Sequence, residues 1–175
     1  MSDYEFVLNK LLNSSITDKR QQAYVLATIK HETAGTFRPL KELGSQKYLQ
    51  SKPYYPYIGR GYVQLTWDYN YKKFGTILGI DLINIPAFAQ RPEIAWKITE
   101  LGMTKGLFTG KSLSDYFYGA EEDWTNARKI INGLDKAELI AGYAKDYYEQ
   151  LKPIDLKKFN STEEALQSML KNWEN

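Results

Sequence analysis

The sequence lacks cysteine, and it contains a single histidine among its 175 residues. Without thiols the chain has no disulfide framework, no thiol nucleophile and no zinc ribbon, and any metal site would need mostly oxygen ligands. It also lacks an apolar run of about 18 residues and the features of a secretory signal. We therefore expect no metal, no cofactor and no stable membrane insertion. We also expect the chain to be made in the cytoplasm.

Net charge is also low, since 23 Lys and Arg residues face 21 Asp and Glu residues, a formal charge of +2. No cluster of five or more basic residues occurs, so a nucleic-acid partner is not expected. Aromatic residues are more abundant, at 14%, and include 14 Tyr and 4 Trp. Such rings suit sugar-binding clefts as well as cores, although core packing explains most of them.

The length predicts one domain over residues 1–175, because a chain of this size buries roughly 70% of its unfolded surface. Apolar residues recur every three or four positions, which predicts a mostly helical fold. Residues 36–60 contain Pro39, Pro53 and Pro56 and are expected to form an irregular loop, with a short strand possible in GYVQLTW. The expected helices cover 4–12, 18–33, 68–78, a segment that starts at Pro92, 122–131, 135–151 and a short terminal segment after 161.

Two helix starts have the form of a capping box, Asp135 with Glu138 and Ser161 with Glu164. The first is expected to open a helix whose buried stripe begins at Leu139. Residues 152–175 are too few for a further domain, so we expect them to pack against the body.

Glu32 is the first candidate for chemistry, because it continues the apolar stripe of Val25 and Ile29 at a predicted helix end. A carboxyl group among apolar neighbours favours its protonated form, as a general acid requires, whereas a solvated carboxylate at a helix end is an equally good interpretation. His31 does not open a zinc motif, because Gly35 stands where a second His would be needed. We expect His31 to be a packing residue.

Glu42, ten residues later in the predicted loop, could flank a glycosidic bond together with Glu32. Loop carboxylates are usually just solvated, so the pairing is weak on spacing alone. A second cluster lies in IGRGYVQLTWDYNY, where uncharged donors and acceptors stand beside aromatic rings, as recognition of N-acetyl sugars requires. A buried polar turn would explain it equally. Its members are Arg60, Gln64, Thr66, Trp67, Tyr69 and Asn70.

The ordered segments HETAGTFRPLKE, YIGRGYVQLTWDYNYKKFG, GLFTGKSLSDYF and ARKIINGLDKAELIAGYA closely resemble the catalytic domain of family 19 glycoside hydrolases, over about residues 20–150. The resemblance implies a lysozyme-like, mostly helical fold and an inverting mechanism. It implies that Glu32 is the general acid, that Glu42 is the general base and that Thr66 helps to hold the attacking water.

The same resemblance implies that Gln64, Tyr69 and Asn70 line the substrate cleft, that Asn132 contacts substrate and that Arg128 steers the carboxylates. Arg60 and Trp67 are included as substrate-binding candidates. The short, cysteine-free form looks more like the phage and prophage lysozyme-like members than like plant chitinases.

We therefore expect an endolysin-type muramidase that cleaves the MurNAc–GlcNAc bond of bacterial peptidoglycan. Such an enzyme would act as a monomer, stay in the host cytoplasm and depend on a separate holin to reach the wall. A chitinase is the alternative within the same chemistry. A catalytically inactive wall-binding module is the alternative of another class, although binding alone would require neither glutamate.

Overall fold

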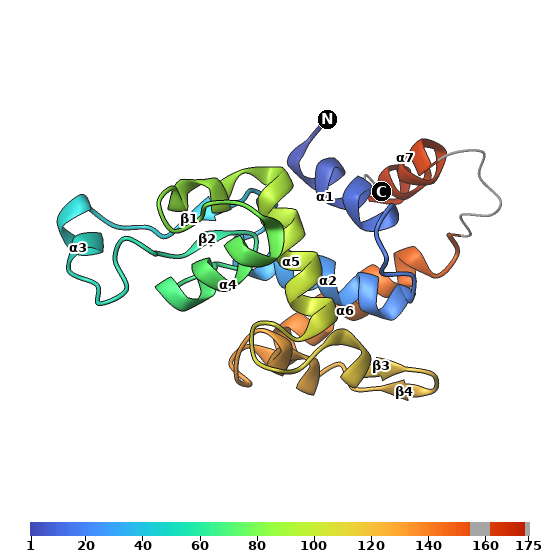
Figure 1. The fold of residues 1–175 in the computed structure, drawn as a ribbon. Coiled ribbons are helices and arrows are strands. Elements are labelled where there is room, and N and C mark those ends of the chain that lie inside the picture. Colours follow the sequence, from blue (N-terminus) through green and yellow to red (C-terminus); the bar gives the residue numbers. More distant parts are fainter. Residues whose placement is uncertain (155–161, 174–175) are drawn as a thin grey trace.

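The computed structural model describes residues 1–154 and 162–173, and it is mostly helical, as predicted (Figure 1). No helix in these ranges is long and apolar enough to cross a membrane. The α-helices are α1 (Asp3–Leu12), α2 (Lys19–Glu32), α3 (Gln46–Gln50), α4 (Asp68–Leu78), α5 (Pro92–Lys105), α6 (Ala137–Leu151) and α7 (Thr162–Trp173). Short 3₁₀-helices are η1 (Pro86–Gln90), η2 (Leu113–Asp115) and η3 (Asn126–Ile130), and the strands are β1 (Leu40–Lys41), β2 (Arg60–Gly61), β3 (Phe117–Tyr118) and β4 (Glu121–Glu122).

Helix α2 is the centre of the larger of two hydrophobic clusters. Every residue from 22 to 29 is buried, so the helix is enclosed on all sides, and it packs most extensively against α6. Asp18 caps its first turn by accepting a hydrogen bond from the backbone N–H of Arg20. The last residue of this rigid helix is Glu32.

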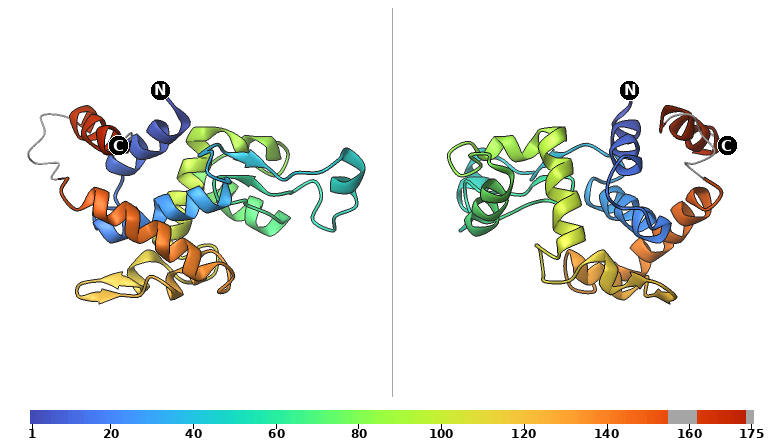
Figure 2. Two further views of the ribbon diagram at one scale, coloured as in Figure 1. Left: turned by 180° about the vertical axis from the view of Figure 1, so that it is seen from behind. Right: turned by 45° about the vertical axis from the view of Figure 1, so that its right-hand side comes forward.

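A smaller cluster lies on the other side of α5. It includes Leu65 after β2, Tyr71 and Phe74 of α4, Ala89 of η1 and Ile98 of α5. Helix α5 also contributes Ala95 and Trp96 to the larger cluster. We call the part of the chain around the larger cluster the larger lobe and the part around the smaller cluster the small lobe. Helix α5 lies between the two lobes (Figures 1 and 2).

The segment predicted to be an irregular loop is more ordered than expected. Strands β1 and β2 pair antiparallel, with Leu40 opposite Gly61 and Lys41 opposite Arg60, and the short helix α3 lies between them. The strand foreseen in GYVQLTW is therefore present at its first residue, whereas α3 was not predicted. Ser45 caps α3 by accepting from the backbone N–H of Tyr48.

The helix predicted over 122–131 is wrong. Residues 117–122 form the β3–β4 hairpin, and only 126–130 are helical, as a 3₁₀-helix. Asp123 accepts hydrogen bonds from both the backbone and the side-chain nitrogen of Asn126. The bond to the backbone N–H caps the start of this short helix, which begins later than predicted because residues 117–122 are paired in the hairpin.

The capping box predicted at Asp135 is also wrong. Helix α6 begins one residue after Lys136, which has a left-handed backbone (φ 59°), and Glu138 accepts from the hydroxyl of Thr125. Leu139, expected in the buried stripe, is 44% exposed. The predicted cap at Ser161 lies outside the described residues, and α7 packs against α1 and α6.

Candidate active site

Glu32 forms an ion pair with an arginine that is 96 residues away in the sequence. The Nη1 of Arg128, in η3, lies 2.9 Å from Oε1 of Glu32. The Arg128 side chain is 4% exposed and that of Glu32 is 18% exposed. Nε of Arg128 donates to the carbonyl of Asp135, which fixes the guanidinium in place. The pair is therefore short, charge-assisted and largely shielded from water.

This geometry matches neither of the two sequence interpretations of Glu32 completely. The carboxylate is neither fully solvated nor surrounded by apolar groups alone, because a buried guanidinium faces one of its oxygens. The structure thus brings Arg128 to the carboxylate that the family resemblance implied it would steer. His31, the preceding residue, is half-buried at the same helix end.

Glu42 follows β1 and is held by neutral donors. The hydroxyl of Tyr54 donates to Oε1 at 2.7 Å, and the backbone N–H of Gly59 donates to Oε2 at 3.1 Å. The hydrogen bond to the Glu42 carboxylate raises the pKa of Tyr54 to about 12. Both oxygens of Glu42 are thus oriented without a cationic partner.

Tyr54 is the site residue that the sequence analysis missed. It is 12 positions from Glu42 in a proline-containing segment, and no periodic pattern marks it. Its ring packs edge-on against Trp67 with ring centres 5.3 Å apart. Tyr54 thereby joins the candidate base to an exposed aromatic surface.

Gln64 and Arg60 act first as internal braces of the small lobe. The side-chain amide of Gln64 donates to the carbonyls of Leu40 and Gly61. Arg60 is buried and donates to the carbonyl of Pro56 and to the hydroxyl of Tyr71. The sequence-level alternative of a buried polar turn therefore describes these two side chains.

A pocket of about 140 Å³ lies between the segment after β2 and the larger lobe. Thr66, Trp67 and Asn70 line it. Gln64, whose side-chain amide donates to backbone carbonyls, lines it too. The Thr66 hydroxyl donates to the carbonyl of Gln64, and the Asn70 amide donates to the carbonyl of Thr66. Leu65, Val63, Phe108 and Ile131 complete its wall.

Two residues beside this pocket hold strained backbones. Gln64 has φ 58° and Trp67 has φ 78°, a region that bulky residues rarely adopt. Reciprocal hydrogen bonds between Arg60 and Leu65, and one from the Trp67 N–H to the carbonyl of Tyr57, maintain the turn. Strain held in this way concentrates at functional sites.

Aromatic surface continues from the pocket. The rings of Trp67 and Tyr69 stack at 6.0 Å with an interplanar angle of 18°, and they are 39% and 60% exposed. Asn132 is exposed in the loop after η3, where its side chain accepts from the backbone N–H of Gly133. Its backbone N–H donates to the carbonyl of Arg128 in η3.

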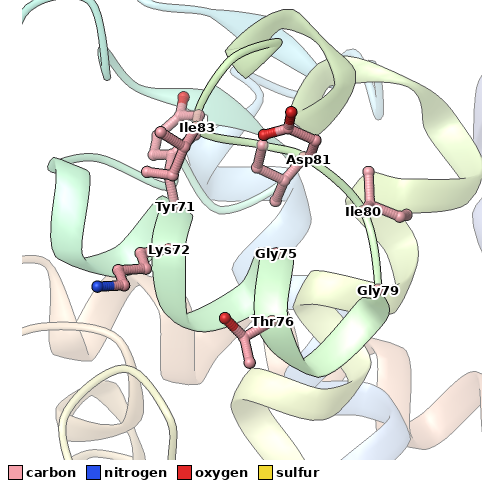
Figure 3. A pocket seen from close by; sticks show the side chains of 9 residues that line it. Tyr71, Lys72, Gly75, Thr76, Gly79, Ile80, Asp81 and Ile83 are labelled. Atoms are coloured by element: carbon pink, nitrogen blue, oxygen red, sulfur yellow. The ribbon is translucent and has the colours of Figure 1, made fainter.

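The opposite face of α4 borders a separate pocket of about 260 Å³. Figure 3 shows it between α4 and the turn through Gly79, with Lys72 pointing outward on one side and Asp81 on the other. Asn70 and Lys72 are about 200° apart around the helix, so this pocket is distinct from the one beside Thr66. Within the described residues, no three His, Asp or Glu side chains gather as a metal site would require.

The sequence and the fold were compared with those of known proteins. No family model matches the sequence. An endochitinase of Theobroma cacao is 40% identical over 101 aligned residues, covering 46% of this chain and 32% of that protein. An endochitinase of Arabidopsis thaliana is 31% identical over 149 residues, covering 79% of this chain and 54% of that protein. The chain thus spans about a third to a half of the length of these plant relatives.

The fold resembles the crystal structure of a bacterial family 19 chitinase, with a TM-score of 0.52 and 26% identity over 84% of this chain and 83% of that chain. The chain is therefore related in sequence and in fold to the family 19 chitinases, and the predicted lysozyme-like fold is confirmed. The relatives are chitinases, so the phage endolysin subtype stays a prediction.

Proposed function

We propose that this protein is an inverting glycoside hydrolase of β-1,4-linked glycans that contain N-acetylglucosamine. The observation that carries the proposal is the presence of Glu32, the last residue of α2, and Glu42, the residue after β1, which are oriented by entirely different partners. Two carboxyl groups with separate tasks are what glycoside hydrolysis requires, and the family resemblance is the reason for proposing inversion.

Glu32 would act as the general acid. In its protonated form it donates a proton to the glycosidic oxygen as the bond to the anomeric carbon breaks. The resulting carboxylate lies 2.9 Å from the Arg128 guanidinium, which stabilises the negative charge that develops. Arg128 thus also keeps the side chain in one orientation through the cycle.

Glu42 would act as the general base. It takes a proton from a water molecule, whose oxygen attacks the anomeric carbon from the face opposite the leaving group. Tyr54 and Gly59 orient the carboxylate as neutral donors. We assign Thr66, whose side chain lines the 140 Å³ pocket, to the positioning of that water, as the family resemblance implies.

Chitin is the substrate that the relatives favour, because the plant proteins are named endochitinases and the structural neighbour is a chitinase. The glycan strand of peptidoglycan is the second candidate. The observation in its favour is local charge: residues 33–67 contain five Lys or Arg and one acid, Glu42. Holin-dependent release from a host cytoplasm belongs to this second candidate.

The test is digestion of chitin hexamer and of purified peptidoglycan sacculi by the wild-type protein, with mass spectrometry of the fragments. Proton NMR of the hexamer reaction should first show the α-anomer, because the substrate bond is β. A first product that keeps the β configuration would contradict inversion. Failure of the folded protein to cleave either glycan would favour the inactive binding module.

A further inference from the structure

The segment that follows the candidate base Glu42 forms a projecting arm. We define the arm as residues 43–58, which connect Glu42 to Gly59. The arm projects from the β1–β2 pair and contains α3 at its outer end. Both figures show α3 away from the two lobes (Figures 1 and 2). The arm therefore presents a surface beyond the cleft itself.

The arm has a built shape. The hydroxyl of Ser51 donates to the carbonyl of Tyr48 at 2.5 Å, and Leu49 is 4% exposed. The ammonium of Lys52 lies 4.2 Å from the ring centre of Tyr48, and the ring also contacts Gly44, where a Cβ atom would meet it at 2.4 Å. These contacts hold the Lys52 ammonium and the Tyr48 ring in a fixed arrangement.

Charge on the arm has one sign. It contains Lys47 and Lys52 and no acidic residue, and Lys41 precedes it. No described carboxylate lies within ion-pair distance of these three lysines. The whole chain carries only +2, so this local excess is balanced elsewhere, as at the acidic β4 strand.

The arm is continuous with the candidate active site. Tyr54 of the arm bonds Glu42 and packs against Trp67, which lines the pocket and stacks on Tyr69. Tyr48 and Tyr55 of the arm are 47% and 39% exposed. A glycan that extends from the pocket over Trp67 therefore meets a surface of aromatic faces and unneutralised ammonium groups.

We propose that the arm is a docking surface for a glycan strand that carries carboxylates, which is the chemistry of muramic acid and its attached peptides. This inference rests on the proposed function and selects its anionic substrate class. The uncharged sugar faces would lie on Tyr55 and on the Trp67–Tyr69 stack, and the carboxylates would pair with Lys47 and with Lys52, which lies over the Tyr48 ring. Chitin has no carboxylates and gains nothing from the lysines.

Binding is measured in a Glu32→Gln background, so that the glycan stays intact, by co-sedimentation with purified sacculi and with chitin beads at low and high salt. A Glu42→Gln background repeats the experiment in case the first variant folds poorly. The test variant is Lys47→Gln with Lys52→Gln. The matched control is Lys105→Gln with Lys145→Gln. These substitutions replace two exposed lysines of α5 and α6 and remove the same amount of charge.

The test variant should bind sacculi about two- to thirty-fold more weakly at low salt, the range expected for two exposed ion pairs. Its chitin binding and the control variant should not change. Added salt, or amidation of the wall carboxylates, should remove most of the difference. Equal losses for the test and control variants, or an equal loss on chitin, would overturn the docking proposal.

Hydrolysis by the wild-type protein is scored separately, so the two proposals can fail independently. Loss of sacculus binding in the test variant, with neither glycan cleaved by the wild type, would retain the docking surface and reject the enzyme. If the wild type cleaves either glycan and the substitutions at Lys47 and Lys52 do not change sacculus binding, the enzyme is retained and the docking surface is rejected. Competition by nucleic acid as strong as that by soluble wall fragments would also reject the carboxylate-bearing glycan as partner.

Discussion

The two candidate catalytic carboxylates occupy contrasting environments. Glu32 ends a helix that is buried on all sides, and its partner is a charged group 96 residues away in the sequence. Glu42 follows a two-residue strand, and its partners are neutral donors within 17 residues. One carboxylate is thus fixed by the folded core and an opposite charge, the other by a local loop. Substitutions at the two sites should separate stability from catalysis in different ways.

The largest expected effect is that of Glu32→Gln. Loss of the transferable proton should lower kcat by about 10² to 10⁴-fold, the usual contribution of general acid catalysis. The same change leaves the guanidinium of Arg128 without a counter-charge in a largely buried setting, so the melting temperature should also fall. Turnover of chitin hexamer and calorimetry measure the two effects.

Glu121→Gln is the matched control, because Glu121 is an exposed carboxylate on the β3–β4 hairpin. It should leave turnover and melting temperature close to wild type. Full activity in a folded Glu32→Gln protein would sink the assignment of the general acid.

Glu42→Gln should lower kcat by a comparable factor, because the amide cannot take a proton from water. Its melting temperature should stay nearly unchanged, since no buried charge is left unpaired. Azide, a small nucleophile that needs no base, should restore part of the turnover in this variant and none in Glu32→Gln. Retention of wild-type kcat would place the base elsewhere.

Tyr54→Phe should have a smaller effect. The ring contact with Trp67 is kept, and one of the two hydrogen bonds to Glu42 is lost. We expect kcat to fall about two- to ten-fold, the equivalent of one net hydrogen bond, with KM less affected. A KM effect without a kcat effect would make Tyr54 a substrate contact rather than a positioning residue.

A spectroscopic readout tests the same contact independently of activity. The Glu42 carboxylate disfavours the phenolate of Tyr54, so in Glu42→Gln the pKa of Tyr54 should fall from about 12 towards its ordinary value of 10.0. NMR of tyrosines labelled at the ring carbon that bears the hydroxyl follows this titration, with Tyr54→Phe identifying the signal. An unchanged titration in Glu42→Gln would mean that the bond is not formed in solution.

These contrasts also explain what could be predicted from sequence. Helices α2, α4 and α5 were foreseen because their apolar periodicity reflects burial over several turns. Helix α3 and strand β1 were not, and β2 matches the expected strand only at Gly61, because elements of two to five residues depend on tertiary partners. The 122–131 error arises because residues 117–122 pair as a hairpin, so that Asp123 caps only the short turn at 126–130, and the misplaced cap at 135 arises because Glu138 accepts from the Thr125 side chain.

The candidate site divides in the same way. Glu32 was marked by its position on a buried stripe, but its pairing with Arg128 follows from the packing of distant segments and was implied only by family resemblance. Gln64 and Arg60 stand in the motif because they brace the turn, a role that composition cannot distinguish from sugar binding. Tyr54 carried no local signal at all.

The smallest expected effect tests whether the turn beneath Glu42 must be tightly packed. A Cβ atom at Gly59 would lie 2.7 Å from the side-chain oxygen of Gln64. That oxygen ends a flexible side chain, but the adjoining amide nitrogen is held by the carbonyls of Leu40 and Gly61, so it can shift only by weakening those bonds. Gly59→Ala should therefore loosen the N–H that orients Glu42.

We expect Gly59→Ala to destabilise the protein by about 1 kcal/mol, the net value of a typical hydrogen bond, and to lower kcat only about two- to three-fold. Gly142→Ala is the comparison on α6, where an added Cβ meets nothing within 4 Å and better helix propensity should raise stability slightly. Urea unfolding and hexamer turnover measure both variants. If Gly59→Ala behaves like Gly142→Ala, the small lobe adapts freely, and the orientation of Glu42 depends on Tyr54 rather than on the turn.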